Sequence, residues 1–108
     1  MIMLDQGAFA YFRPFVCRLT GPYLVLQLDG SRHDAFTDDI WLSVLVRRVA
    51  PRLAATLAPG SVNASAAVGA ESAYLDAFFE TYLDGRPASL LSGQLRTHPV
   101  VKVVARRR

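Results

Sequence analysis

The segment 38–49 constrains the fold most, because it carries the clearest helix signals in the chain and has almost no polar face. Thr37 is a favoured N-cap residue, two aspartates follow it in the first turn, and Pro51 lies just beyond the carboxyl end. Between these ends, Ser43 is the only polar gap in the run 40–46. A helix that is apolar on nearly every side belongs in a core or at an interface.

The composition is that of a folded domain with a surplus of apolar side chains. The chain has 108 residues, of which 52% are hydrophobic and 19% are charged. This balance excludes a disordered chain, and the length suffices for one hydrophobic core but not for two. We therefore expect a single domain over residues 1–108, part of whose apolar surface is covered by a partner.

Two runs rich in β-branched and aromatic residues predict a hairpin near the amino terminus. The runs are 15–19 and 23–29, and a Thr-Gly-Pro turn separates them. Leucines alternate along the second run, so we expect the leucine face to meet the core. Segment 8–12 could form a further strand that ends before Pro14, and residues 1–6 receive no assignment.

The second half of the chain predicts helices and two more strands. Segment 51–58 favours a short helix, and 61–68 alternates small residues as a weak strand would. Segment 70–84 predicts a helix with an aromatic stripe and a closing Gly85. A short helix over 88–95 and a strand over 100–104 follow.

The predicted fold class is α+β. An antiparallel sheet packs against two main helices, and its strands and helices are the hairpin 15–19/23–29, the weak strand 61–68, the carboxyl-terminal strand 100–104 and the helices 38–49 and 70–84.

Reactive side chains concentrate in the loop and first helical turn that follow the second strand; they are Asp29, His33, Asp34, Asp38 and Asp39. Carboxylates and one imidazole suit a hard cation or acid–base chemistry. Their spacing matches no calcium loop, and one imidazole is too few for a typical zinc site. We interpret these residues as turn and helix-cap groups, and we expect no metal ion, no cofactor and no catalytic residue.

Cys17 and His98 are weak candidates for catalysis. Cys17 lies within a predicted strand, where a small buried side chain is typical, and His98 precedes a proline as turn residues do. A single cysteine cannot form an internal disulfide, which suits a reducing compartment. We see neither a secretory signal nor a spanning apolar run, so we expect a cytoplasmic chain.

Positive charge gathers at the carboxyl end, where we expect a basic tail over 105–108. The candidates for contact with nucleic acid or an acidic partner are Arg96, Lys102, Arg106, Arg107 and Arg108. Aromatic residues, on which single-stranded nucleic acids stack, do not interleave with them. We therefore favour a solvated or partner-docked end.

Taken together, these features predict a non-enzymatic interaction module, a subunit of a homo-oligomer or larger assembly. A viral or phage particle is one context that fits. The candidate interface residues are Ile40, Trp41, Val44, Leu45, Val62, Ala64 and Ala66.

Two alternatives stay open. The first is a small nucleic-acid-binding protein that uses the basic carboxyl-terminal strand and tail. The second is a small enzyme or ligand binder whose pocket lies between the hairpin and the aromatic helix, with Tyr74, Tyr82, His33 and Asp34 as its polar lining.

Overall fold

A three-stranded mixed sheet forms the centre of the computed structural model, which describes residues 1–56, 60–93 and 97–108. The strand order is β1-β2-β3; β1 pairs with β2 in parallel, and β2 pairs with β3 antiparallel. In chain order the elements are β1 (Ile2–Leu4), α1 (Ala8–Val16), β2 (Tyr23–Leu28), the 3₁₀ helix η1 (His33–Phe36), α2 (Asp39–Val49), α3 (Pro51–Thr56), α4 (Ala64–Tyr82), α5 (Ser89–Ser92) and β3 (Val101–Arg107).

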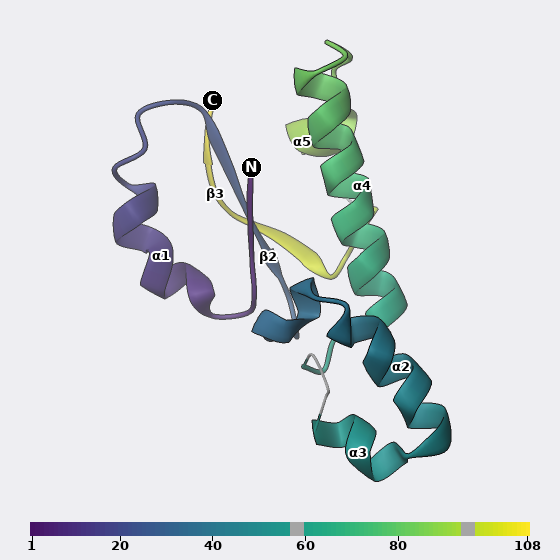
Figure 1. The fold of residues 1–108 in the computed structure, drawn as a ribbon. Helices are drawn as coiled ribbons and strands as arrows, with labels where there is room; N and C mark the ends of the chain where they lie inside the picture. Colours follow the sequence, from purple (N-terminus) through teal and green to yellow (C-terminus); the bar gives the residue numbers. More distant parts are fainter. Residues whose placement is uncertain (57–59, 94–96) are drawn as a thin grey trace.

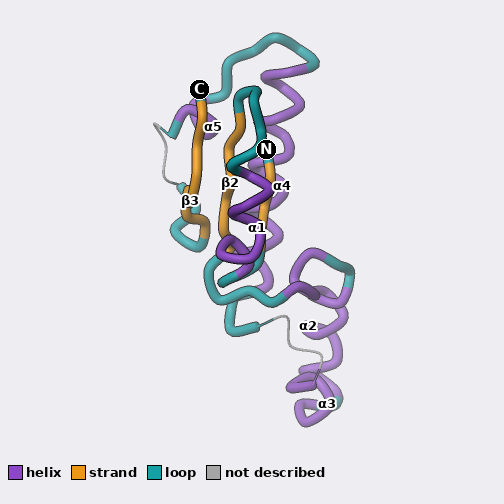
Figure 2. Tube along the Cα trace, turned by 90° about the vertical axis from the view of Figure 1, so that its left-hand side faces the viewer, coloured by secondary structure: helices purple, strands orange, loops and turns teal. Residues whose placement is uncertain are grey.

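Helices cover both faces of the sheet. Figures 1 and 2 show α1 on one face and α4 on the other, with α2 and α3 extending beyond one end. On the α1 side, Val16 packs with Leu4 and Val25. On the α4 side, Ala67 packs with Leu28 in a second cluster. Because both faces are covered, β2 is the most buried strand, as is usual for a strand in an α/β layer.

The predicted hairpin is wrong, because α1 replaces its first strand. Residues 8–16 are helical and connect two parallel strands, which a tight turn cannot do. Pro14 lies inside this helix at an exposed position, where the carbonyl that loses its partner can meet water. The run 15–19 looked like a strand by composition, although Val16 is its only buried residue.

The predicted weak strand over 61–68 is also wrong, since α4 begins at Ala64. Asn63 caps this helix, and its side-chain oxygen accepts a hydrogen bond from the Ala66 N–H at 3.0 Å. The buried residues of α4 follow a helical period; they are Ala67, Ala70, Tyr74 and Ala77. Small alanines on this face let the helix approach the sheet closely. The predicted helix 70–84 is therefore the second part of a longer one.

The carboxyl-terminal strand extends further than expected. We predicted a strand over 100–104 and a tail over 105–108, whereas β3 runs to Arg107 and pairs along all of β2. An irregularity in the pairing between Val25 and Leu26 accommodates one extra residue of β3. The α+β class is confirmed for this small single domain, and the sheet is mixed rather than antiparallel.

The helix predicted over 38–49 is confirmed as α2. Thr37 contributes to its start, because its hydroxyl oxygen accepts from the Asp39 N–H at 3.3 Å. One side of α2 is buried through Ile40 and Ser43. The short helices predicted over 51–58 and 88–95 are present as α3 and α5, and their predicted ends, 57–58 and 94–95, lie outside the described residues.

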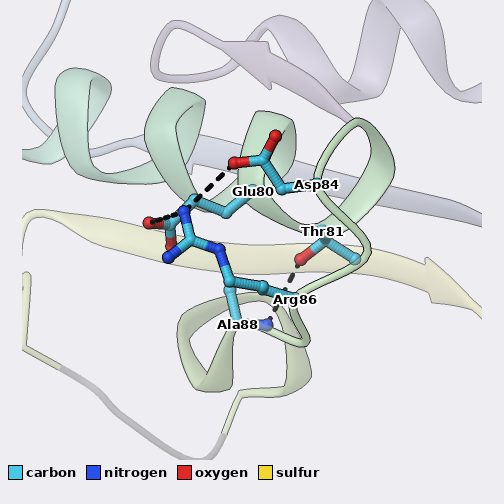
Figure 3. Close-up of polar contacts among 5 residues, drawn as sticks. All are labelled: Glu80, Thr81, Asp84, Arg86 and Ala88. Atoms are coloured by element: carbon cyan, nitrogen blue, oxygen red, sulfur yellow. Dashed lines mark hydrogen bonds and ion pairs between the residues drawn. The ribbon is translucent and has the colours of Figure 1, made fainter.

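Polar contacts hold α5 beside the end of α4, as Figure 3 shows. The Arg86 guanidinium lies 3.0 Å from a carboxylate oxygen of Asp84 and 3.4 Å from one of Glu80. The Ala88 N–H donates to the Thr81 hydroxyl at 3.2 Å. Exposed ion pairs of this kind contribute at most about 1 kcal/mol, so they orient the turn more than they stabilise the fold.

Glu71 on α4 should make stability depend on pH. Its Oε1 atom is buried and has no hydrogen-bond partner within the described ranges, and burial raises the pKa of the carboxyl above its ordinary 4.5. The unfolded chain keeps the ordinary, lower pKa, so the free energy of unfolding falls as the pH rises from about 4.5 through the raised value.

We therefore expect Glu71→Gln to be more stable than the wild type at neutral pH and to lack this loss of stability. Urea unfolding at several pH values between about 4 and 7 measures both effects. A variant that is less stable than the wild type at neutral pH would show that the Glu71 carboxylate has a partner in solution.

No helix in residues 1–56, 60–93 or 97–108 is long and apolar enough to cross a membrane.

Candidate active site

The carboxyl ends of β1 and β2 meet at one edge of the sheet because these strands are parallel. Loops that leave this edge of an open sheet are where such folds build their sites. Two of the loops are joined directly. The Gln6 side-chain oxygen accepts a hydrogen bond from the Gly30 N–H, and the Gln6 N–H donates to the Ser31 carbonyl at 3.3 Å.

A third segment closes against the same loop. The Gly30 carbonyl accepts from the N–H groups of Ser61 and Val62 at 2.8 and 3.0 Å. Gly60 and Gly30 both have a positive φ, of 108° and 73°. A Cβ atom on Gly60 would lie 2.1 Å from the Gly30 carbonyl oxygen, so this approach requires glycine. We call residues 5–6, 29–31 and 60–62 the edge frame.

Ser31 belongs to the structure of the edge frame rather than to its reactive surface. The residue is 4% exposed, and its hydroxyl donates to the Leu28 carbonyl at 2.6 Å. A serine nucleophile needs an accessible oxygen and a neighbouring base. Ser31 therefore serves to fix the turn at the end of β2.

His33 begins the 3₁₀ helix η1, two residues beyond the edge frame, and its side chain is exposed. The backbone around it is well fixed. The Ala35 N–H donates to the Arg32 carbonyl at 2.9 Å, and the Thr37 hydroxyl donates to the Asp34 carbonyl at 2.8 Å. An exposed imidazole on a fixed backbone is suited to proton transfer with a molecule bound at this edge.

Asp29 is engaged by its neighbours at the end of β2. Its carboxylate forms an ion pair with Lys102 and accepts from the Gln27 side-chain amide at 2.9 Å. The hydrogen bond from Lys102, followed by that from Gln27, lowers the pKa of Asp29 below its usual value. Its N–H donates to the Val100 carbonyl at 2.7 Å. Asp29 thus links the edge to β3.

The predicted reactive cluster does not form a metal site. Within residues 1–56, 60–93 and 97–108, no three His, Cys, Asp or Glu side chains lie close enough to hold an ion. Asp39 lies in the first turn of α2 and Asp38 is its N-cap residue, without a capping side-chain bond. Asp34 is exposed beside His33. Cys17 is also exposed, just beyond α1.

Three of the clefts on the described surface bear on the candidate residues. One of about 410 Å³ opens beside the edge frame, between α2 and the start of α4, and Arg47, Ser61 and Asn63 line it. A second, of about 540 Å³, is lined by Tyr74 and His98, whose ring centroids are 6.2 Å apart. The third, of about 390 Å³, lies between β2 and α4 at the opposite end of the sheet.

The pocket expected between the hairpin and the aromatic helix corresponds in place to this third cleft. Tyr82 lines it, as predicted. Tyr74 lines the second cleft instead, and His33 and Asp34 line none of the three. The reason is topological: His33 and Asp34 follow the carboxyl end of β2, whereas Tyr82 faces its amino end.

The predicted interface residues divide between core and surface. Ile40 is buried in the cluster with Leu28 and Ala67. Trp41 and Leu45 are 47% and 62% exposed on α2. The remaining four are half-buried; they are Val44, Val62, Ala64 and Ala66.

The basic candidates are placed along β3. Lys102 pairs with Asp29, and both Arg106 and Arg107 donate to main-chain carbonyls. Arg108 ends the chain after β3, and Arg96 lies outside the described residues.

Sequence reasoning missed Gln6, Gly30 and Gly60 as parts of a site. Both glycines were interpreted as turn residues between helices and strands, and residues 1–6 had no assignment. The sequence contains only an indirect signal for these residues. Asp29-Gly30 and Pro59-Gly60 are turn-forming pairs, but nothing in the sequence indicates that segments 29–31 and 60–62 lie together in the folded chain.

Comparisons with known proteins add one finding. No protein family model and no curated protein matches the chain. Among solved structures, the fold is similar to that of the ferulic acid esterase from Streptomyces cinnamoneus, with a TM-score of 0.71 and 26% sequence identity over 95% of this chain. The chain spans about a third, 33%, of the length of that esterase.

This likeness corrects the predicted function. A non-enzymatic interaction module was expected, and the expectation that the chain is no enzyme followed from it. Similarity in both fold and sequence to an esterase contradicts these predictions and favours the enzyme alternative. The sequence misled because apolar surface and few reactive groups, which are marks of a structural subunit, do not by themselves exclude an enzyme fold.

Proposed function

We propose that this chain forms the histidine-bearing part of an ester hydrolase, with His33 as the general base. The observation that carries the proposal is the exposed His33 imidazole at the carboxyl edge of parallel strands, in a fold similar to an esterase. Active sites of open sheets with helices on both faces gather at this edge. Of the two histidines, His98 is directed elsewhere, against Tyr74.

The chemistry required of His33 is proton transfer. A hydroxyl nucleophile attacks the ester carbonyl while the imidazole takes the hydroxyl proton, and the imidazolium then gives that proton to the departing alcohol. The imidazole next takes a proton from water as the water attacks the acyl intermediate, and the imidazolium returns that proton to the oxygen of the nucleophile as its bond to the acyl group breaks and the acid leaves. Each step needs the imidazole at a fixed place, and the edge frame supports that requirement.

The nucleophilic hydroxyl would come from a part of the enzyme that lies outside the residues described here. Among residues 1–56, 60–93 and 97–108, no hydrogen bond joins a hydroxyl to His33, and the Ser31 and Ser43 hydroxyls donate to main-chain carbonyls. The chain also matches only 33% of the similar esterase. We propose that the catalytic centre is complete only when this chain is joined to the rest of a hydrolase.

Exposed apolar side chains support such a partner surface. Large apolar side chains are exposed on two of the helices; among them are Tyr11 and Phe15 on α1, and Trp41 and Leu45 on α2.

A reducing, cytoplasmic location is a separate proposal, and it rests on the single, unpaired Cys17.

The proposed substrate class is carboxylic esters. Hydroxycinnamate esters are the first to test, because the similar structure is named a ferulic acid esterase. In the experiment, this chain replaces the matching third of the Streptomyces cinnamoneus enzyme, and the chimera is assayed with methyl ferulate and p-nitrophenyl acetate. A folded chimera that hydrolyses neither ester would refute the proposal, provided that the parent enzyme is active in the same assay.

A further inference from the structure

The cleft at the amino end of β2 combines a positive rim with an aromatic wall. Figure 1 places both chain termini and α5 at this end of the molecule. The volume of the cleft is about 390 Å³, which falls within the range of about 300–1,000 Å³ that is usual for small-molecule sites. The residues that define it are Tyr23, Phe78, Tyr82, Arg106, Arg107 and Arg108.

The guanidinium groups of Arg106 and Arg107 are held in place by neutral acceptors. Arg106 donates to the carbonyls of Leu91 and Ser92 at the end of α5, the latter at 2.9 Å, and Arg107 donates to the Leu19 carbonyl at 2.9 Å. These bonds fix the groups without cancelling their charge. The ion pairs in the described ranges involve Arg86 and Lys102, not the arginines of this cleft.

The aromatic wall comes from α4 and β2. The rings of Phe78 and Tyr82 lie 4.8 Å apart at an angle of 44°. Tyr82 is 65% exposed, so part of its ring remains free for a ligand. Tyr23 lines the cleft from β2. Aromatic faces bind flat apolar groups, and guanidinium groups bind carboxylates through paired N–H donors.

We propose that this cleft binds a small aromatic carboxylate. One carboxylate would offset part of the positive charge of the three arginines, and one planar ring would cover the exposed part of the aromatic wall. The cleft is separate from the candidate active site: β2 runs over Tyr23–Leu28, and at a rise of about 3.3 Å per residue its two ends are roughly 17 Å apart. The proposal therefore holds or fails independently of the role of His33.

The test is a titration of the 108-residue chain with trans-cinnamate by isothermal calorimetry at low ionic strength. We expect saturable binding that weakens as salt is added, because charge contributes to it. Cinnamamide, which has the same ring and no charge, should bind at least about tenfold more weakly, as should inorganic phosphate, which has charge and no ring.

Variants locate the site. Arg108→Gln and Arg107→Gln should each weaken cinnamate binding by about tenfold, the loss expected for one charge-assisted hydrogen bond. Arg86→Gln is the matched control, since Arg86 is an exposed arginine that pairs with Glu80 and Asp84 away from this cleft; its affinity should equal that of the wild type. Thermal melting checks that each variant is folded.

Several results would overturn the proposal. They are equal affinity for cinnamate and cinnamamide, equal affinity for cinnamate and phosphate, and unchanged affinity in the Arg108→Gln variant, whose exposed side chain is not part of the packed structure. Tighter binding of a short oligonucleotide that competes with cinnamate would also overturn it, and would assign the rim to nucleic acid instead.

Discussion

A His33→Gln substitution should lower kcat for ester hydrolysis by about 10²–10⁴-fold, the usual contribution of a positioned general base. The measurement is made in the chimera that carries this chain in place of the matching third of the similar esterase. Glutamine keeps much of the size and polarity of histidine and cannot accept and return a proton near neutral pH. We therefore expect KM to change little, since the substrate does not depend on His33 for binding.

The matched control is His98→Gln in the same chimera. His98 is half-buried, and the centroid of its ring lies 6.2 Å from that of Tyr74. Its replacement should leave kcat within the variation of repeated assays. Equal losses in both variants would indicate damage to the fold, and an active His33→Gln chimera would remove His33 from the mechanism.

Local signals in the sequence predicted α2 well and α1 badly, and the difference is physical. The α2 segment has a cap, a charged first turn and a proline stop that all favour the same helix. The α1 segment contains aromatic residues and Pro14, which favour an extended chain, and its helix depends on connecting β1 with β2. A parallel pairing between residues 2–4 and 25–27 leaves no signal within either segment.

The candidate site shows the same limit. His33 and Asp34 stood out in the sequence because reactive residues are rare in this chain, yet nothing local distinguished a catalytic histidine from a turn residue. What the fold adds is the edge frame, which ends two residues before His33 in the loop after β2. Gln6 and Gly30 are 24 positions apart in the sequence, and Ser61 and Gly30 are 31 positions apart, yet both pairs are in contact. Such contacts arise only from the tertiary fold.

Gly60→Ala should be the most destabilising single substitution at the edge frame, by about 2–4 kcal/mol. The residue has a φ of 108°, which side chains rarely adopt, and its Cβ would lie 2.1 Å from the Gly30 oxygen and 3.0 Å from the Arg32 nitrogen. These neighbours are backbone atoms, so a side chain cannot rotate away to relieve the clash. The loop that carries His33 must therefore move.

Gly69→Ala provides the opposite expectation with the same chemical change. Gly69 lies within α4, and a Cβ there would meet no heavy atom within 4 Å. Alanine is favoured over glycine inside a helix by about 0.5–1 kcal/mol, so this variant should be more stable than the wild type. Urea unfolding of both variants measures the two shifts, and ester hydrolysis in the chimera measures what each does to His33. If the edge frame positions the base, Gly60→Ala loses activity even under conditions where it remains folded, and Gly69→Ala retains its activity. Equal activity in the two folded variants would mean that the loop after β2 does not need the edge frame.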